Sequence, residues 1–260
     1  MAPTPSISPR RTRCSPLLRR AGGLLALLLL GQSAGGVADA PDYEHQRAQL
    51  MQEIAGDVEQ TANYIDKREL DPRVMAVLSR VPRHEFVPDS QKRYAYENRP
   101  LPIGYGQTIS QPYIVALMTD LAKVGPQAKA LEVGTGSGYQ AAILAELAQR
   151  VYTIEIIPEL ADEARQRLRR LGFDRVEIRQ GDGYYGWEEA APFDLILVTA
   201  AASHVPPPLI RQLKPGGRMV IPVGGRFQVQ QLLLVEKTLE GEVHTRQILP
   251  VRFVPLTGEH

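Results

Sequence analysis

The sequence predicts an α/β protein whose core is a doubly wound, mostly parallel sheet with helices on both faces. Short apolar segments typical of strands alternate with amphipathic segments typical of helices from about residue 131 onward. Consecutive parallel strands need right-handed crossovers, and such sheets bind their ligands at the carboxyl ends of the strands. The last 30 residues, rich in Val, Leu and Phe, predict closing antiparallel strands at the C-terminal edge.

Five segments carry the strand pattern, and helix signals fall between them. The segment 193–199 is apolar almost throughout, as expected of a parallel strand that is buried on both faces. A helix can begin at Pro158, and Gly172 ends it. The predicted strands are the residues before Gly134 and the segments 151–155, 175–180, 193–199 and 218–223, and the predicted helices include 141–148 and 158–171.

The residues before the sheet predict a helical N-terminal segment. Leu50, Ile54, Val58 and Ile65 recur at helical steps within residues 42–70, which favours a helix that covers the sheet or the loop of the active site. The predicted organisation is a leader over residues 1–40, a helical segment over 41–100 and the core domain over 101–260.

The leader resembles a secretory signal peptide. Five arginines precede the apolar run 24–30, and Ala38-Asp-Ala40 has the small-residue pattern of a cleavage site. The run is too short for a stable membrane span. We expect a cytoplasmic protein, with periplasmic export as the alternative.

Composition excludes several classes of site. The first 40 residues carry five Arg and one Asp, a net charge of +4, which leaves −3 for the rest of a chain whose total is +1. A mildly acidic body argues against a non-specific nucleic-acid binder. The single cysteine, Cys14, lies in the leader, and the five histidines lack the spacing of metal ligands, so we expect no metal.

The segment 131–140 is the strongest indication of a cofactor site. Gly134, Gly136 and Gly138 alternate between a short apolar strand and a helical run, where glycine lets a ligand approach the backbone. The dinucleotide pattern G-x-G-x-x-G does not match when counted from Gly134, because its third glycine position is Tyr139. Counted from Gly136, the third position is Ala141, which the looser form of the pattern allows. The pattern E-x-G-x-G-x-G, with Glu132 as its acid, resembles the first motif of S-adenosylmethionine-dependent methyltransferases of the Rossmann-like type.

Acidic residues follow the next two predicted strands. Glu155 ends the strand 151–155, where a carboxylate can accept hydrogen bonds from both hydroxyls of a ribose. Asp182 follows the strand 175–180 between two glycines; such a residue often only marks a turn. In methyltransferases of this class an acid at that point faces the adenine amino group. Gly134, Glu155, Asp182 and Thr199 are therefore expected on one edge of the sheet.

The segment 101–112 points to the methyl acceptor. We expect a loop in which Ser110 caps the following helix and Pro112 lies in its first turn. A long loop with two glycines and short polar side chains is costly in conformational entropy, and such loops often contact substrate.

The blocks 106–112 and 131–140 together resemble the bacterial type of protein-L-isoaspartate O-methyltransferase. Further matches are 81–83, 86–87, 181–183, 192–194, 198–201 and 251–256, so the resemblance covers about residues 60–257. It implies methyl transfer from S-adenosylmethionine to the α-carboxylate of L-isoaspartyl residues in damaged proteins and peptides.

The resemblance also assigns residues. Ser110 matches the serine of the family's active site, which orients the substrate carboxylate, and the role of Glu132 stays open. The cofactor residues it implies, with the glycine turn, are Gly134, Gly136, Gly138, Glu155, Asp182 and Gly183. The residues of the substrate loop and its C-terminal neighbour are Gln107, Thr108, Ile109, Gln111 and Thr257.

Two alternatives remain open from the sequence. One is a methyltransferase for another substrate, such as nucleic acid or a small molecule; the Asn/Asp-Pro-Pro-Tyr motif of base methyltransferases is replaced by Val198-Thr-Ala-Ala201. The other is a non-catalytic S-adenosylmethionine-binding protein. The expected partners are isoaspartyl proteins and peptides, without nucleic acid or a membrane span, and the chain is expected to act as a monomer.

Overall fold

The computed structural model describes residues 42–225 and 229–259. Residues 41–260 form one compact unit. The leader predicted over residues 1–40 lies outside the described residues, and the further boundary at residue 100 stays a prediction.

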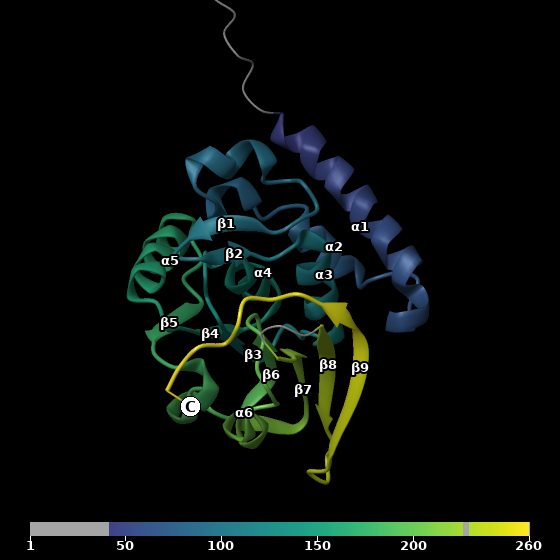
Figure 1. Ribbon diagram of the computed structural model, residues 1–260, viewed down its shortest axis with the longest axis vertical. Helices are drawn as coiled ribbons and strands as arrows, with labels where there is room; N and C mark the ends of the chain where they lie inside the picture. Colours follow the sequence, from purple (N-terminus) through teal and green to yellow (C-terminus); the bar gives the residue numbers. More distant parts are fainter. Residues whose placement is uncertain (1–41, 226–228, 260) are drawn as a thin grey trace, which may run out of the picture. The chain divides into compact units, whose positions relative to one another are not determined.

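The core of this unit is a seven-stranded sheet in the order β5-β4-β3-β6-β7-β8-β9 (Figure 1). Neighbouring strands from β5 to β7 are parallel, whereas β8 is antiparallel to β7 and β9 to β8. The strands are β3 (Lys129–Val133), β4 (Arg150–Glu155), β5 (Val176–Gln180), β6 (Phe193–Val198), β7 (Leu213–Val223), β8 (Gln230–Lys237) and β9 (Val243–Val251). The predicted mostly parallel sheet with an antiparallel C-terminal edge is confirmed.

The direction of winding reverses between β3 and β6. From β3 the chain adds β4 and β5 on one side, and then returns to add β6 and the later strands on the other. Parallel sheets leave a crevice at such a switch point, beyond the carboxyl ends of the strands. The fold therefore places a ligand site where β3 meets β6.

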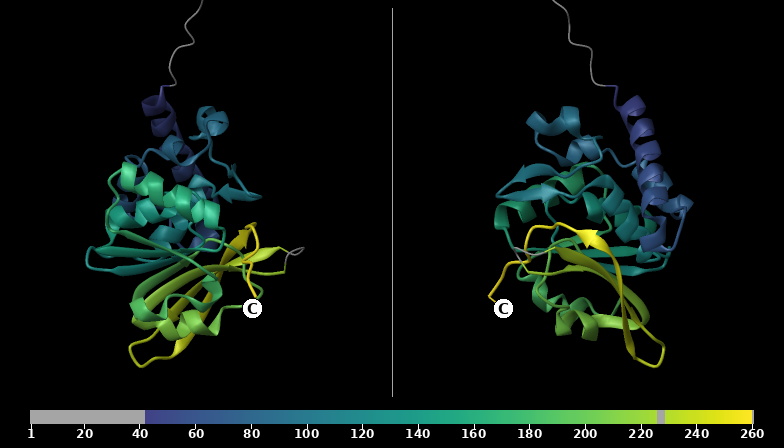
Figure 2. Two further views of the ribbon diagram at one scale, coloured as in Figure 1. Left: turned by 90° about the vertical axis from the view of Figure 1, so that its left-hand side faces the viewer. Right: turned by 45° about the vertical axis from the view of Figure 1, so that its right-hand side comes forward.

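Helices cover the two faces of the sheet unequally (Figure 2). Strand residues such as Ala130 and Leu195 share a core with residues of five helices, whereas Leu131 and Ile196 pack in a second core with Leu209. The first face carries α1 (Tyr43–Ile65), α2 (Pro72–Leu78), α3 (Pro112–Leu121), α4 (Tyr139–Leu147) and α5 (Pro158–Arg170), and the second core includes α6 (Pro207–Gln212). Short 3-10 turns are η1 (Arg83–Phe86), η2 (Asp89–Tyr94), η3 (Gly183–Tyr185) and η4 (Glu188–Ala190).

The helical periodicity in the sequence is confirmed. The buried residues of α1 are the four predicted ones, Leu50, Ile54, Val58 and Ile65. Helix α5 begins at Pro158 as predicted, and the left-handed Gly172 follows its last turn. Helix α4 begins at Tyr139, two residues before the predicted start, because Gly138 already turns the chain into its first turn.

Two predictions for residues 101–112 are wrong. This segment is not an open loop but an antiparallel hairpin of β1 (Leu101–Gly104) and β2 (Gln107–Ile109), which pairs its backbone groups and buries Leu101 and Ile109. Ser110 does not cap helix α3; the N-cap is Gln111, which makes no side-chain capping bond. Pro112 does lie in the first turn.

The described helices include none with both the length and the apolarity needed to cross a membrane.

Candidate active site

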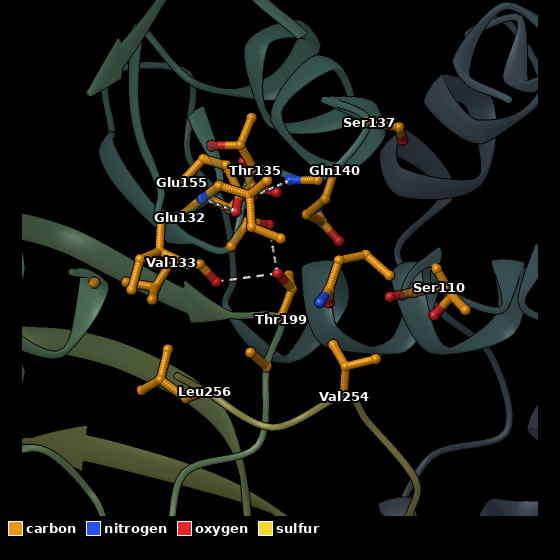
Figure 3. A pocket seen from close by; sticks show the side chains of 18 of the residues that line it. Ser110, Glu132, Val133, Thr135, Ser137, Gln140, Glu155, Thr199, Val254 and Leu256 are labelled. Atoms are coloured by element: carbon orange, nitrogen blue, oxygen red, sulfur yellow. Dashed lines mark hydrogen bonds between the residues drawn. The ribbon is translucent and has the colours of Figure 1, made fainter. Parts of the chain in front are cut away.

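A cavity lies at the carboxyl edge of the sheet, at the switch point between β3 and β6 (Figure 3). We call it the sheet-edge cavity. The space between its walls amounts to about 770 Å³, part of which is open solvent. Its walls are formed by residues 107–110, Val115, residues 132–137, Tyr139, Gln140, residues 154–157, Gly183, Thr199, Ala200 and residues 254–257.

The glycine turn after β3 is shaped by close backbone contacts. Gly134 has φ +96°, and a Cβ on it would lie 2.6 Å from the Oγ1 of Thr199. Thr199 reaches over the turn and donates its hydroxyl to the carbonyl of Gly134 at 2.6 Å. A Cβ on Gly183 would collide with Val133. Glycine at 134 and 183 is therefore required by the close packing of the backbone against Thr199 and Val133 at this end of the cavity.

Glu155 closes the turn from the next strand. Its Oε2 accepts from the amide of Gly136 at 2.7 Å, and its Oε1 accepts from the amide of Ile157 at 3.0 Å. These two backbone donors fix a buried carboxylate against the glycine turn. The position suits the predicted recognition of a ribose, which stays a proposal.

Glu132 is fully buried beside this turn, on the same cavity wall. Thr153 donates its hydroxyl to Oε2 at 2.6 Å, and the hydroxyls of Thr153 and Thr135 lie 2.7 Å apart. The other oxygen, Oε1, has no hydrogen-bond partner among the described residues. Burial raises the pKa of Glu132 to about 8, and the nearby charge of Glu155 adds to the rise. A buried carboxyl oxygen without a partner is costly, which indicates a ligand group that completes the site.

Ser110 lies across the cavity from these acids (Figure 3). The residues that follow β9, which we call the C-terminal strap (252–257), supply the adjoining wall through Val254 and Leu256. The backbone of Ala201, just after β6, holds this strap by bonds with Val254 and Leu256 of 2.8 and 2.7 Å. Three distant parts of the chain therefore meet around one cavity.

A buried arginine links the Ser110 wall to the cofactor turn. The guanidinium of Arg83 donates to the carbonyl of Ser110 at 2.7 Å and to that of Ala95 at 2.9 Å. It also lies over the ring of Tyr139, the first residue of α4, 4.9 Å from the ring centroid. Burial lowers the pKa of Arg83 to about 10, so it remains charged at neutral pH. Arg83 was a family match in the sequence, but its contact with Ser110 depends on tertiary placement.

Most predicted site residues line the cavity, and three do not. Gly138 packs against Leu168 of α5, and Gln111 faces a neighbouring groove. Asp182 accepts from the amides of Tyr184 at 2.9 Å and Glu259 at 3.3 Å, beside the cavity residue Gly183. The cavity contains Gln107, Thr108, Ile109, Ser110, Gly134, Gly136, Glu155, Gly183 and Thr257.

The charges of the cavity favour a cationic ligand. Glu132 and Glu155 are the only acidic residues among the described residues that line it, and no Lys, Arg or His lies among them. Because the pKa of Glu132 is raised to about 8, the negative charge at neutral pH comes mainly from Glu155. Sequence reasoning left Glu132 without a role and did not anticipate Thr135 or Gln140 on the wall. Within residues 42–225 and 229–259, no cluster of His, Cys, Asp and Glu could hold a metal ion.

The sequence profile of the protein-L-isoaspartate(D-aspartate) O-methyltransferase family matches residues 59–260. The chain belongs to this family. A protein-L-isoaspartate O-methyltransferase 2 of Syntrophobacter fumaroxidans is 65% identical over 241 residues, which cover 92% of this chain and 98% of the relative. Another, from a Polaromonas species, is 70% identical over 210 residues, or 81% of this chain and 100% of the relative.

Solved structures of the family share the fold. A protein-L-isoaspartate O-methyltransferase superposes with a TM-score of 0.68 at 27% identity, over 80% of this chain and 66% of the other. A β-aspartate methyltransferase of Plasmodium falciparum in complex with S-adenosyl-L-homocysteine gives a TM-score of 0.67 at 24% identity, over 84% and 99% of the two chains.

Proposed function

We propose that this protein transfers a methyl group from S-adenosylmethionine to the α-carboxylate of L-isoaspartyl residues in damaged proteins and peptides. The observation that carries the proposal is a single cavity with an acidic cofactor wall on one side and Ser110 on the other. Membership of the family supports the choice of acceptor.

The residues present fit S-adenosylmethionine. When bound, it supplies an electrophilic methyl group on a positively charged sulfonium, and it carries an ammonium group as well. The carboxylate of Glu155 supplies negative charge for such a ligand, and the unpartnered Oε1 of Glu132, which is largely protonated at neutral pH, supplies a polar group. We assign Gly134, Gly136 and Gly183 to the positions where the cofactor approaches the backbone closely. Gly138 shapes the turn after β3, and Asp182 lies next to Gly183.

The acceptor needs positioning more than activation. A carboxylic acid with a pKa of about 3.5 to 4 is ionised at neutral pH, so no general base is required. We assign Ser110 to orient the attacking carboxylate by hydrogen bonding, and Arg83 to hold the Ser110 backbone in place. Val254 and Leu256 of the strap exclude water from the reacting oxygen. Gln107, Thr108, Ile109, Gln111 and Thr257 complete the acceptor side.

The product is a methyl ester, which closes to a succinimide without further catalysis. Hydrolysis of the succinimide returns part of the damaged residue to normal aspartate. The chemistry therefore amounts to repair of isoaspartyl linkages.

Methyl transfer from labelled S-adenosylmethionine tests the proposal directly. Two peptides are compared that differ only in having an L-isoaspartyl or a normal aspartyl residue at one position. We expect label only in the isoaspartyl peptide. Equal labelling would indicate another acceptor class, and binding of the cofactor without any labelling would indicate a non-catalytic protein.

We further propose that the chain acts as a monomer in the cytoplasm. The synthesis of S-adenosylmethionine in the cytosol supports the proposed location. Mass spectrometry of the native N-terminus tests the location, because removal of the leader would indicate export. Sedimentation equilibrium tests the oligomeric state.

A further inference from the structure

A groove adjoins the sheet-edge cavity on the Ser110 side. We call it the strap groove, since the C-terminal strap and the end of β9 form one of its walls. Five residues line both the cavity and the groove, so the two spaces lie side by side: Thr108, Ser110, Thr199, Val254 and Pro255. The groove is wide and open to solvent along its length, so an extended stretch of peptide can enter it from outside.

The strap groove has a different chemical character from the cavity. Its walls offer apolar side chains, including Ile114, Phe253 and Val229, the last of which is 71% exposed. Arg252 is the only charged residue that lines it in the described part of the chain. Arg252 is exposed and has no hydrogen bond or ion pair with any described residue. A cation without a partner beside an apolar surface is available to bind a carboxylate of a ligand.

We propose that the strap groove binds the peptide segment next to the damaged residue, and that Arg252 selects segments carrying a carboxylate there. The inference rests on the proposed function, because it assumes that the acceptor reaches the cavity past Ser110. The reacting carboxylate lies at Ser110, where cavity and groove join, and Arg252 lines only the groove. Arg252 therefore meets a second acidic group, on a neighbouring residue of the substrate.

The net charge of the chain bears on the cause of any preference for peptides with an acidic neighbour. The net charge is +1 over the whole chain and −3 after residue 40, so long-range electrostatics would contribute little to a preference for acidic peptides. A preference for an acidic neighbour must then come from a local cation. The groove provides one such cation among its described residues, Arg252.

The test uses isoaspartyl peptides that differ at one position, scanned over the two residues on either side of the damage. Each position carries Glu, Gln or Lys in turn. At one position or more we expect kcat/KM to be about two- to fivefold higher for Glu than for Gln, the scale of an exposed charge pair. In Arg252→Gln this ratio falls to about one, and in Arg252→Glu the Lys peptide becomes the better substrate.

The matched control is Arg246→Gln, which removes an exposed arginine from β9 outside the groove. This variant should keep the Glu-to-Gln ratio of the wild type. A wild-type ratio of one at every position, or a ratio that survives in Arg252→Gln, overturns the proposal.

Equilibrium binding separates this inference from the proposed function. The same peptides, labelled with a fluorophore, are titrated with the protein in the presence of S-adenosyl-L-homocysteine and followed by anisotropy. Should no isoaspartyl peptide be methylated, the proposed function fails, while the ratio of dissociation constants for the Glu and Gln peptides still decides the role of Arg252. If the ratio of dissociation constants for the Glu and Gln peptides changes in Arg252→Gln, the proposed role of Arg252 is supported. Equal affinities of the wild type for the two peptides refute it.

Discussion

The two sides of the sheet-edge cavity are built in different ways. The acidic side comes mainly from strand ends and the turn between β3 and α4, and it is held by backbone bonds such as that from Gly136 to Glu155. The acceptor side joins the β1–β2 hairpin to the C-terminal strap, segments more than 130 residues apart in the sequence. The first side is thus a local product of the α/β fold, whereas the second exists only once the chain has closed.

This difference also divides the chemistry. The acidic side carries Glu132 and Glu155, and the groove that continues the acceptor side carries Arg252. A cationic methyl donor and an anionic acceptor peptide are therefore directed to opposite sides of Ser110. Substitutions on the acidic side should therefore weaken binding of the methyl donor and leave the acceptor peptide unaffected, and substitutions on the acceptor side should do the reverse.

The largest expected effect concerns the charge of Glu132. Its pKa of about 8 in the folded protein lies above the usual 4.5, so the folded state retains the proton to higher pH than the unfolded chain. The contribution of Glu132 to the free energy of unfolding is fully present below pH 4.5 and is lost as the pH rises through about 8. One unit of pKa corresponds to 1.36 kcal/mol, so the free energy of unfolding falls by about 5 kcal/mol at most. Urea unfolding from pH 5 to 9 should show this decline in the wild type.

Glu132→Gln removes the ionisation and keeps the shape. Its free energy of unfolding should fall less between pH 5 and 8 than that of the wild type. Glu53→Gln, on the exposed face of α1, serves as the control and should follow the wild type. Parallel curves for Glu132→Gln and the wild type would show that the buried acid is ionised throughout.

Gly134→Ala tests whether the acidic side depends on backbone geometry. The φ of +96° and the contact with Thr199 place a non-glycine residue in a strained state that costs about 3 kcal/mol. The dissociation constant of S-adenosylmethionine should rise about 100-fold, measured by calorimetry. Gly125→Ala, where a Cβ meets nothing within 4 Å, should bind normally. Unchanged affinity in Gly134→Ala would remove the turn from the cofactor site.

Ser110→Ala tests the acceptor side separately. Loss of a hydrogen bond to a charged group costs about 2 kcal/mol, so kcat/KM on an isoaspartyl peptide should fall about 30-fold. The affinity for S-adenosylmethionine should stay within about twofold of the wild type, because Ser110 lies across the cavity from the glycine turn. Ser79→Ala, outside the cavity, is the control. Unaltered turnover in Ser110→Ala would contradict the assignment.

The smallest effect is expected at the tip of the hairpin. Tyr105 has φ +53° between two glycines and is 52% exposed. Tyr105→Gly relieves the left-handed strain but adds chain entropy to the unfolded state, so it should stabilise by about 1 kcal/mol or less. Urea unfolding measures the change. A loss of stability well above this value would mean that the Tyr105 ring packs on the hairpin.

Local patterns in the sequence predicted the parts of the fold that depend on local rules. The buried stripe of α1, the start of α5 at Pro158 and the doubly wound, mostly parallel sheet follow from periodicity and from the handedness of crossovers. Gly134 follows β3, Glu155 ends β4, Asp182 follows β5 and Thr199 follows β6. The four residues therefore lie on one edge of the sheet, as expected from the sequence. Family membership, expected from the resemblance, is confirmed as well.

The errors lie where distant contacts decide the local structure. The hairpin over 101–109 forms because its apolar residues reach the core, and Ser110 gives up the helix cap while its carbonyl accepts from Arg83. No pattern near Ser110 in the sequence could show that bond, since 27 residues separate the two.

The sequence by itself determined the class of fold, the glycine turn and the acids that follow its strands, because each depends on neighbours a few residues away. Only the tertiary structure decided what stands opposite that turn. It brought the strap across the sheet edge, buried Arg83 behind Ser110 and made Arg252 the one charged residue among the described residues of the groove. Such contacts join residues far apart in the chain, and they exist only after the sheet and its helices have closed around a common core.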